Sequence, residues 1–213
     1  MTDTRVQPQK SVRRAKSGQR VGPRTSRSEL SRQRIIDAVI ALIFRGQSRF
    51  GAVDVAKEAQ MGLRTVFNHF DDMDSLYREM DAQVHQKVLL PILLRPYEAT
   101  AWRDQIVEAA ARRAEICEAC FPAGKFARSM QTHSVALRES VERSQALERS
   151  AIDALVPQDL QERDLLVGAI DVTLSFESWA RLRDGAHLGA EEAEKIWVFT
   201  TRSLLDQHDQ LHP

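Results

Sequence analysis

Residues 60–76, QMGLRTVFNHFDDMDSL, decide the fold. Gly62 can serve as the N-cap of a short helix over residues 63–69, and Val66 and Phe70 lie one turn apart on its core side. A three-residue turn joins this helix to a preceding short helix, an arrangement typical of a helix-turn-helix. The outward residues are types that bond base edges or phosphate oxygens: Arg64, Thr65, Asn68 and His69. Any short amphipathic helix also leaves polar residues outside, so this pattern alone does not identify DNA binding.

The preceding segment supplies the other helices of such a motif. Apolar residues recur at intervals of three and four from Ser28 onward, which predicts a first helix that ends at Gly46. Gly51 is the expected N-cap of a second helix that ends near Ala59. Three short helical segments therefore precede residue 70.

The rest of the chain also reads as helix. Asp71 or Asp72 is the expected N-cap of a long fourth helix that ends around Pro91. From Ala101 onward there is no sustained period-two alternation and no hairpin signal, so we expect an all-α fold. The later helices are expected at residues 101–119, 124–130, 134–155, 159–183 and 190–207.

The zero net charge conceals two oppositely charged parts. Residues 1–70 hold 14 Lys+Arg and 5 Asp+Glu, a net of +9, whereas residues 71–213 hold 16 and 25, a net of −9. Residues 1–27 combine many basic residues with few large apolar ones, so we expect a flexible basic arm. This asymmetry indicates a polyanionic partner, either nucleic acid or an anionic membrane surface. A solvated tail without a partner is the alternative.

Several classes of protein are disfavoured. No run of about 18 apolar residues exists, and the N-terminus lacks the apolar region of a secretory signal. With Cys117 and Cys120 alone no disulfide framework is possible, which favours a reducing, cytoplasmic compartment. This pair lacks further zinc ligands, so we expect buried thiols, with redox sensing as a minor alternative. No catalytic motif or phosphate loop is recognisable, so we expect no enzyme activity, no cofactor and no metal.

Residues 34–76 resemble the N-terminal domain of TetR/AcrR-type transcriptional regulators. In that family a Gly follows the first helix, an Asp-Ile-Ala-like triplet lies in the second, and Thr-Leu-Tyr-x-His-Phe forms the third. An acidic residue and a Leu open the fourth. The corresponding residues here are Gly46, Asp54-Val55-Ala56, Thr65-Val66-Phe67-Asn68-His69-Phe70, and Asp74 with Leu76.

The resemblance implies a homodimeric, cytoplasmic repressor that binds a double-stranded DNA operator and is released by a small-molecule effector, without a membrane partner. Its parts would be the arm 1–27, a helix-turn-helix domain 28–74, and a ligand-binding and dimerisation domain 75–213. The residues expected at the DNA are Gly62, Leu63, Arg64, Thr65, Phe67, Asn68, His69, Arg49 and, from the arm, Arg24 and Arg27. Two other classes remain open: a helical enzyme or small-molecule binding protein, and a nonspecific nucleic-acid or membrane-surface protein.

Four positions depart from the family pattern. Gln60 stands where the family has Gly, so we expect the turn to be wound differently, because a left-handed Gln costs about 1 kcal/mol. Phe67 replaces a Tyr whose hydroxyl bonds a phosphate. Met73 replaces a phosphate-binding Lys, and Gly51 replaces a Ser or Thr cap. We therefore expect DNA binding to depend on the basic arm, which could enter a neighbouring minor groove.

Residues 169–205 are similar to the last two helices of many members of this family, which pair with their copies as a four-helix bundle. Apolar stripes at helical spacing agree with such a dimer, although burial inside one subunit is the alternative for each residue. The expected interface residues are Leu166, Ile170, Thr173, Leu174, Ala180, Ala193, Ile196, Trp197, Thr200 and Leu204.

An effector pocket is expected between the helices of the C-terminal part. Aromatic and apolar side chains favour an apolar or aromatic effector, although most such residues at helical spacing belong to a core. The candidate pocket residues are Trp102, Phe121, Phe126, Met130, Phe176 and Trp179, with His133 and Glu177 as polar contacts.

Overall fold

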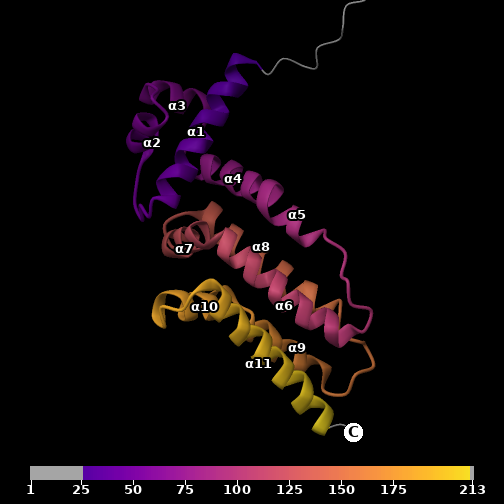
Figure 1. Ribbon diagram of the computed structural model, residues 1–213. Coiled ribbons are helices and arrows are strands. Elements are labelled where there is room, and N and C mark those ends of the chain that lie inside the picture. The colour runs from indigo at the N-terminus through magenta and orange to yellow at the C-terminus, as the bar shows by residue number, and fades with distance from the viewer. Residues whose placement is uncertain (1–25, 212–213) are drawn as a thin grey trace, which may run out of the picture.

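The computed structural model describes residues 26–211 of the chain (Figure 1). Capping residues set the limits of its first helix. α1 (Arg27–Phe44) begins after Ser26, whose hydroxyl accepts a hydrogen bond from the Glu29 backbone. The Glu29 carboxylate accepts one from the Ser26 backbone in return, which completes a capping box. The helix stops before Gly46, whose φ of +82° is a conformation that glycine adopts without strain. The predicted stop at Gly46 is confirmed.

The turn between α2 (Ala52–Glu58) and α3 (Leu63–His69) contains a left-handed residue that is not glycine, Gln60, with a φ of +54°. The Met61 N–H donates to the Ala56 carbonyl at 2.9 Å, as in a Schellman motif. The expectation that Gln60 changes the winding of the turn is therefore wrong. The hydrogen bonds at the end of α2 and the packing of Met61 offset the strain.

The next helices begin with hydrogen bonds from backbone N–H groups to side-chain carboxylates. The Asp72 carboxylate accepts a hydrogen bond at 2.7 Å from a backbone N–H in the first turn of α4 (Met73–Val84), so Asp72 rather than Asp71 is the cap. Gly51 has no side chain with which to cap α2. The Asp54 carboxylate instead accepts the Gly51 N–H at 2.9 Å, which ties the first turn together.

α4 continues through a π-helical turn, η1 (His85–Leu89), into the short α5 (Leu90–Leu93). The Leu90 N–H donates to the carbonyl of His85, five residues back. Pro91 has no N–H to donate and its ring crowds the preceding turn, which accounts for the wider turn at this place. The continuous helical segment ends just beyond Pro91, close to its predicted end.

The later helices differ from the prediction in four places. The helix expected from residue 159 begins at Arg163, and the last helix ends at Leu211 rather than at residue 207. Ser175 interrupts the helix expected over residues 159–183, because its hydroxyl accepts the Ser178 N–H at 3.2 Å and caps a new helix. Pro122 lies in the first turn of α7, which starts earlier than predicted. The elements are α6 (Trp102–Ala119), α7 (Phe121–Met130), α8 (Val135–Asp153), α9 (Arg163–Thr173), α10 (Phe176–Ala180), η2 (Arg181–Gly185) and α11 (Ala190–Leu211). All regular structure in residues 26–211 is helical, and the all-α prediction is confirmed.

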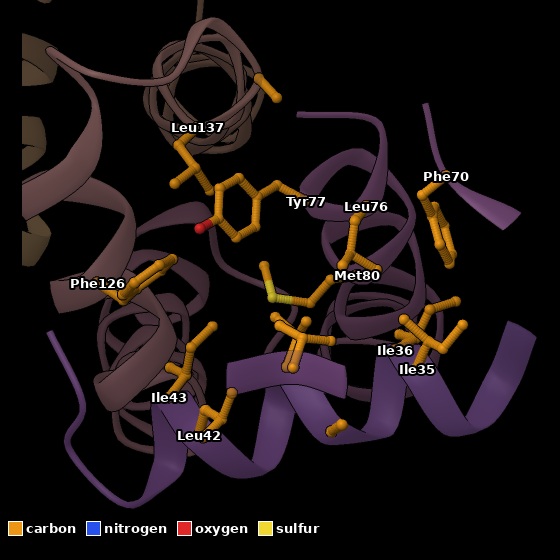
Figure 2. Close-up of a cluster of buried hydrophobic side chains, with 14 of the residues drawn as sticks. Ile35, Ile36, Leu42, Ile43, Phe70, Leu76, Tyr77, Met80, Phe126 and Leu137 are labelled. Carbon is orange, nitrogen blue, oxygen red and sulfur yellow. The ribbon is translucent and has the colours of Figure 1, made fainter. Parts of the chain in front are cut away.

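Buried side chains of α1 to α4 pack against α7 and α8 in one cluster (Figure 2). This N-terminal cluster consists of Ile35, Ile36, Ala38, Val39, Leu42, Ile43, Val55, Ala56, Ala59, Val66, Phe70, Leu76, Tyr77, Met80, Phe126, Ala127, Ala136, Leu137 and Val141. Phe126, 4% exposed, stacks on Phe50 with ring centroids 5.1 Å apart and meets Tyr77 edge-on at 5.6 Å. The first three helices thus share their core with helices that follow residue 75.

A second cluster fills the other end of the molecule, where α9, α10 and α11 lie on the opposite side of α6 to α8 from α2 and α3 (Figure 1). This C-terminal cluster consists of Ile106, Ala109, Ala110, Ala114, Cys117, Ile152, Val156, Leu166, Val167, Ile170, Leu174, Phe176, Trp179, Ala193, Trp197 and Leu205. Trp179 and Trp197 meet edge-on at 4.8 Å. Within residues 26–211, no helix combines the length and apolar character needed to cross a membrane.

Candidate nucleic-acid interface and internal cavity

Helix α3 buries one side and exposes the other, as its spacing predicts. Val66 and Phe70 are buried in the N-terminal cluster together with Val55 and Ala59 of the preceding helix and turn. The α3 surface, defined by the residues expected at the DNA, consists of the exposed Gly62, Leu63, Arg64, Phe67 and Asn68 and the partly exposed Thr65 and His69. The core residues therefore fix the helix and leave these side chains accessible.

The arginines of this region divide into paired and unpaired ones. Arg32 and Arg45 form ion pairs with carboxylates. Arg27, Arg49 and Arg64 are exposed, and their side chains make no hydrogen bond or ion pair with other residues in the range 26–211. An arginine is always charged and presents five N–H donors, so these three guanidinium groups are available for phosphates or base edges.

Arg32 holds the C-terminal end of α3 in place, a role that the sequence analysis missed. Its guanidinium donates to the His69 carbonyl and, through Nε, to the Glu79 carboxylate at 2.8 Å. The same group lies 4.3 Å from the centroid of the Phe70 ring, and its bond to Glu79 raises the pKa of Arg32. These contacts join α1, α3 and α4. They arise from residues far apart in the chain, so no local pattern reveals them.

Two positions that depart from the family pattern lie in different surroundings. Phe67 is 51% exposed on the α3 surface, so its ring is accessible without a hydroxyl. Met73, in contrast, packs against the N-terminal cluster. Arg24 and the rest of residues 1–25 lie outside the described residues, so the expected arm contacts stay predictions. Arg27 stands in the first turn of α1.

A cavity of about 410 Å³ lies among η1, α5, α6, α7, α8 and α10. Its volume is in the range of small-molecule sites, and its walls are mainly apolar. This central cavity is lined by His85, Leu89, Leu93, Arg113, Ile116, Cys117, Cys120, Gly124, Arg128, Ser144, Leu147, Glu148, Ser150, Ala151, Ala154 and Phe176.

Most of the predicted pocket residues lie elsewhere. Phe176 is the one member of that set that lines the central cavity. The others are Phe126 and Met130 in or against the N-terminal cluster, Trp102, Phe121 and Trp179 in or against the C-terminal cluster, and His133 on the surface. Glu177 is exposed and accepts a hydrogen bond from Arg128 Nε at 2.6 Å, which connects it to the cavity wall. The aromatic residues of the prediction thus serve mainly the core.

Three charged residues of the cavity wall were missed. Arg113, 7% exposed, lies 2.7 Å from the Glu148 carboxylate, and Arg128 lies on α7 next to Phe176. Burial raises the pKa of Glu148, and the charges of Arg113 and Arg128 oppose that rise. One feature of the sequence indicated a buried charge in this region. Arg113 falls on the buried stripe of α6 between Ala109 and Cys117, where a charge is exceptional.

Cys117 and Cys120 are free thiols that both line the central cavity. Burial raises the pKa of Cys117 to about 12 and that of Cys120 to about 11. The thiolate is the reactive form of cysteine, so these thiols are poorly suited to redox sensing near neutral pH. Their place in the wall agrees with the expected role as small apolar residues.

The predicted dimer residues divide between the core and the surface. Five of them are buried in the C-terminal cluster of their own subunit: Leu166, Ile170, Leu174, Ala193 and Trp197. Thr173, Ala180, Thr200 and Leu204 are partly buried, and Ile196 is exposed. The structure therefore corrects the prediction for the buried five: they take the alternative of burial inside one subunit.

Apolar side chains of the same two helices face outward beside the predicted Ile196, and three of them were not predicted: Leu165, Val172 and Phe199. Leu165 and Val172 are seven residues apart on α9, so they lie on one side of that helix. Ile196 and Phe199 are three residues apart on α11, and Val172 and Phe199 are each 72% exposed. The outer apolar face, defined as these four residues, is a candidate surface for contact with another protein.

The fold is similar to that of solved transcriptional regulators. One, described as a TetR-family transcriptional regulator from Rhodococcus sp., has a TM-score of 0.63 and 15% identity, over 82% of this chain and 98% of that chain. A second, a transcriptional regulator from Rhodococcus sp. Rha1, has a TM-score of 0.62 and 15% identity, over 83% and 97%. No protein-family model and no curated protein sequence matches the chain. At this identity the likeness shows the fold, and it agrees with the fold that the sequence resemblance implies.

Proposed function

We propose that the protein is a transcriptional regulator of the TetR type, without enzyme activity, that binds a two-fold-symmetric DNA operator as a homodimer and responds to a small-molecule effector. The observation that carries the proposal is the α3 surface. Arg64 and Asn68 are exposed there, and their side chains have no partner among residues 26–211, on a helix fixed by Val66, Phe70 and Arg32. A recognition helix must be held in a fixed position by its core contacts and must present accessible hydrogen-bond donors to the DNA.

The charges around α3 support DNA as the partner. Arg27, Arg49 and Arg64 carry positive charge that no carboxylate in the described part of the chain pairs with, and residues 1–70 have a net charge of +9 (14 basic minus 5 acidic residues). Arg can bond guanine bidentately, and Asn can do so with adenine. The DNA-binding residues proposed are Gly62, Leu63, Arg64, Thr65, Phe67, Asn68, His69, Arg49, Arg27 and, from the arm, Arg24.

The outer apolar face supports dimerisation through α9 and α11. Large exposed apolar side chains on two neighbouring helices are costly in water unless a partner covers them. A second copy can cover them with the same face, since a two-fold dimer interface is isologous. We therefore assign the interface to Leu165, Val172, Ile196 and Phe199, flanked by the partly buried Thr200.

Helix α4 provides a connection between the α3 surface and the central cavity. It contributes Leu76 and Met80 to the N-terminal cluster, and the segment that continues it contributes His85 and Leu89 to the cavity wall. An occupant that displaces η1 would therefore tilt α4 and move α3. An effector acts in this way if it binds the displaced arrangement more tightly than the DNA-bound one.

Hydrogen bonds between α4 and α8 make this connection stiff. The Asp74 carboxylate accepts hydrogen bonds from the Ser134 hydroxyl at 2.6 Å and from the Val135 backbone at 3.1 Å, at the first turn of α8. About two turns further into each helix, the Asp81 carboxylate accepts one from Arg143 at 2.7 Å. A shift of α4 relative to α8 must break these charge-assisted bonds, so α4 and α8 are expected to move between two discrete arrangements.

A comparison of two DNA fragments tests the proposed function. The full chain is titrated with a fragment from upstream of its own gene and with a random fragment of equal length, at the same salt concentration. We expect binding to the first to be tighter by about 1,000-fold or more. Equal affinity would favour a nonspecific nucleic-acid binder. Absence of DNA binding together with retained small-molecule binding would favour a binding protein of another kind.

Replacing Phe67 with tyrosine is expected to tighten operator binding about fivefold. The added hydroxyl restores a hydrogen bond to a phosphate, worth about 1 kcal/mol. Phe44→Tyr is the matched control, because Phe44 is exposed to the same degree, at 50%, at the far end of α1. It should leave the affinity unchanged. Weaker binding by Phe67→Tyr would show that α3 is placed differently on the duplex.

A further inference from the structure

The central cavity contains more buried hydrogen-bond donors than acceptors. Nε and Nη2 of Arg113 and Nη2 of Arg128 are buried and make no hydrogen bond with any described residue. Arg113 Nη2 lies 2.7 Å from Glu148 Oε2, which is an ion-pair distance without hydrogen-bond geometry. No acceptor atom of the cavity wall is buried and unpaired in the same way. Two arginines of the wall thus carry N–H groups without acceptors; protein atoms cover these N–H groups, so an occupant can supply the acceptors once the side chains shift toward it.

The two guanidinium groups are held in place by the wall itself. Arg113 is 7% exposed, so its charge is almost fully removed from water. Arg128 is fixed by Glu177, which accepts from its Nε at 2.6 Å, and by Phe176, whose ring centroid lies 4.0 Å from its Cζ. The planar Arg128 group therefore keeps Nη2 free on a fixed plane. Such preorganised donors suit a planar anion.

Glu148 does not neutralise both arginines. It is the one carboxylate of the cavity wall, whereas two guanidinium groups act on it. Burial raises its pKa, which disfavours its charged form, and a second anion nearby would raise that pKa further. A protonated Glu148 can itself donate a hydrogen bond. Arg113 pairs with Glu148 and Arg128 with Glu177, so the charges at this wall balance, and the N–H groups without acceptors are what favours an anion.

We propose that the central cavity binds an amphipathic monocarboxylate, whose carboxylate accepts hydrogen bonds from Arg113 and Arg128 and whose apolar body lies against Leu89, Leu93, Ile116 and Leu147. This inference rests on the proposed function only in taking the cavity as the effector site. The apolar walls and the volume of about 410 Å³ accommodate an aliphatic or aromatic acid of moderate size. A cationic ligand would find no buried unpaired acceptor in this wall.

Calorimetric titration of the full chain in the absence of DNA tests the proposal. The probes are decanoate, the neutral decanamide of the same shape, and decylamine. We expect decanoate to bind at least about tenfold more tightly than decanamide, because charge-assisted hydrogen bonds are about twice as strong as neutral ones. Decylamine should bind most weakly. Equal binding of decanoate and decanamide, or tighter binding of decylamine, would overturn the proposal.

Substitutions of residues that line the central cavity test where the carboxylate of the ligand binds. Arg128→Met keeps an apolar contact with Phe176 and should lower the affinity for decanoate to that for decanamide, which itself should not change. Arg149→Met is the control, because Arg149 lies on the same α8 as Glu148 but pairs with Asp171 outside the cavity. Unchanged decanoate binding by Arg128→Met would contradict the assignment.

A second variant keeps the test decisive if Arg128→Met does not fold. Glu148→Gln should retain or tighten decanoate binding, because the ligand no longer competes with a carboxylate for Arg113. Loss of decanoate binding in a folded Glu148→Gln protein would contradict the assignment. Operator binding separates this inference from the proposed function. Specific DNA binding without a preference for decanoate overturns the inference alone, and a preference for decanoate without DNA binding overturns the regulator alone.

Discussion

A Phe126→Ala protein is expected to lose about 3–5 kcal/mol of its free energy of unfolding. Phe126 is 4% exposed, and its ring stacks on Phe50 and meets Tyr77 edge-on. Truncation to alanine removes both ring contacts and leaves a cavity where α7 packs against α1 and α4. The same packing is tight enough that burial raises the pKa of Tyr77 to about 12. Urea unfolding monitored by circular dichroism measures the loss.

Leu30→Ala is the matched control, since Leu30 is an exposed apolar residue of α1. That change should alter the unfolding free energy by no more than about 0.5 kcal/mol. The comparison also decides between two roles for Phe126. A residue that only lines an effector pocket would show a near-normal unfolding free energy and weaker effector binding, and this outcome would contradict the place of Phe126 in the core.

A Phe199→Asp protein is expected to be monomeric at concentrations where the unaltered protein is dimeric. An aromatic residue at the centre of an interface typically contributes about 2 kcal/mol, and in a two-fold dimer it is present twice. The sum of about 4 kcal/mol corresponds to roughly a 1,000-fold rise in the dimer dissociation constant. Sedimentation equilibrium measures that constant. Binding to a two-half-site operator should weaken as well, because the two recognition helices are no longer joined.

The control for this change is Leu94→Asp. Leu94 is 74% exposed, follows α5 and does not belong to the outer apolar face, so the same change in chemistry should leave the dimer intact. The helical circular dichroism of both variants should match that of the unaltered protein, because Phe199 is 72% exposed and does not belong to a core. A Phe199→Asp protein that stays dimeric would show that the second copy does not bind through the outer apolar face.

The structure of α3 could be predicted well because its determinants are local. Gly62 begins the helix, and Val66 and Phe70 select the buried side by their spacing. The winding of the preceding turn could not be predicted from propensity, since the strain at Gln60 is offset by hydrogen bonds at the end of α2 and by packing of Met61. Local preference fixed the helix, and tertiary contacts fixed the turn.

The dimer face was misassigned for a physical reason. Both α9 and α11 carry apolar residues on two sides: Ile170 and Trp197 face the core of the subunit, while Val172 and Phe199 face outward. A helix that is apolar on two sides is buried on two sides, but its sequence does not tell which side meets its own subunit. Packing of α11 against α6 and of α9 against α8 and α11 decides this, and α6 is distant from α11 in the sequence.

Most of the aromatic residues expected in an effector pocket lie in or against the two hydrophobic clusters instead. Large aromatic residues such as Phe126 and Trp179 contribute most to a core, so their presence says little about a ligand. Arg113 was the more informative residue, because a charge on the buried stripe of α6 requires a partner. Its position beside Arg128 depends on the packing of α6 against α7, which no local pattern contains.

The central claim, that α3 reads DNA sequence, is tested most directly by the specificity ratio of an Arg64→Ala protein. This ratio is the affinity for the upstream fragment divided by that for a random fragment at the same salt concentration. Arg181→Ala is the control, since Arg181 is exposed in η2 at the other end of the molecule (Figure 1). We predict that Arg64→Ala lowers the ratio by about 10- to 100-fold, as the loss of a bidentate base contact requires, while Arg181→Ala leaves it unchanged. An Arg64→Ala protein that keeps the full ratio would contradict the account.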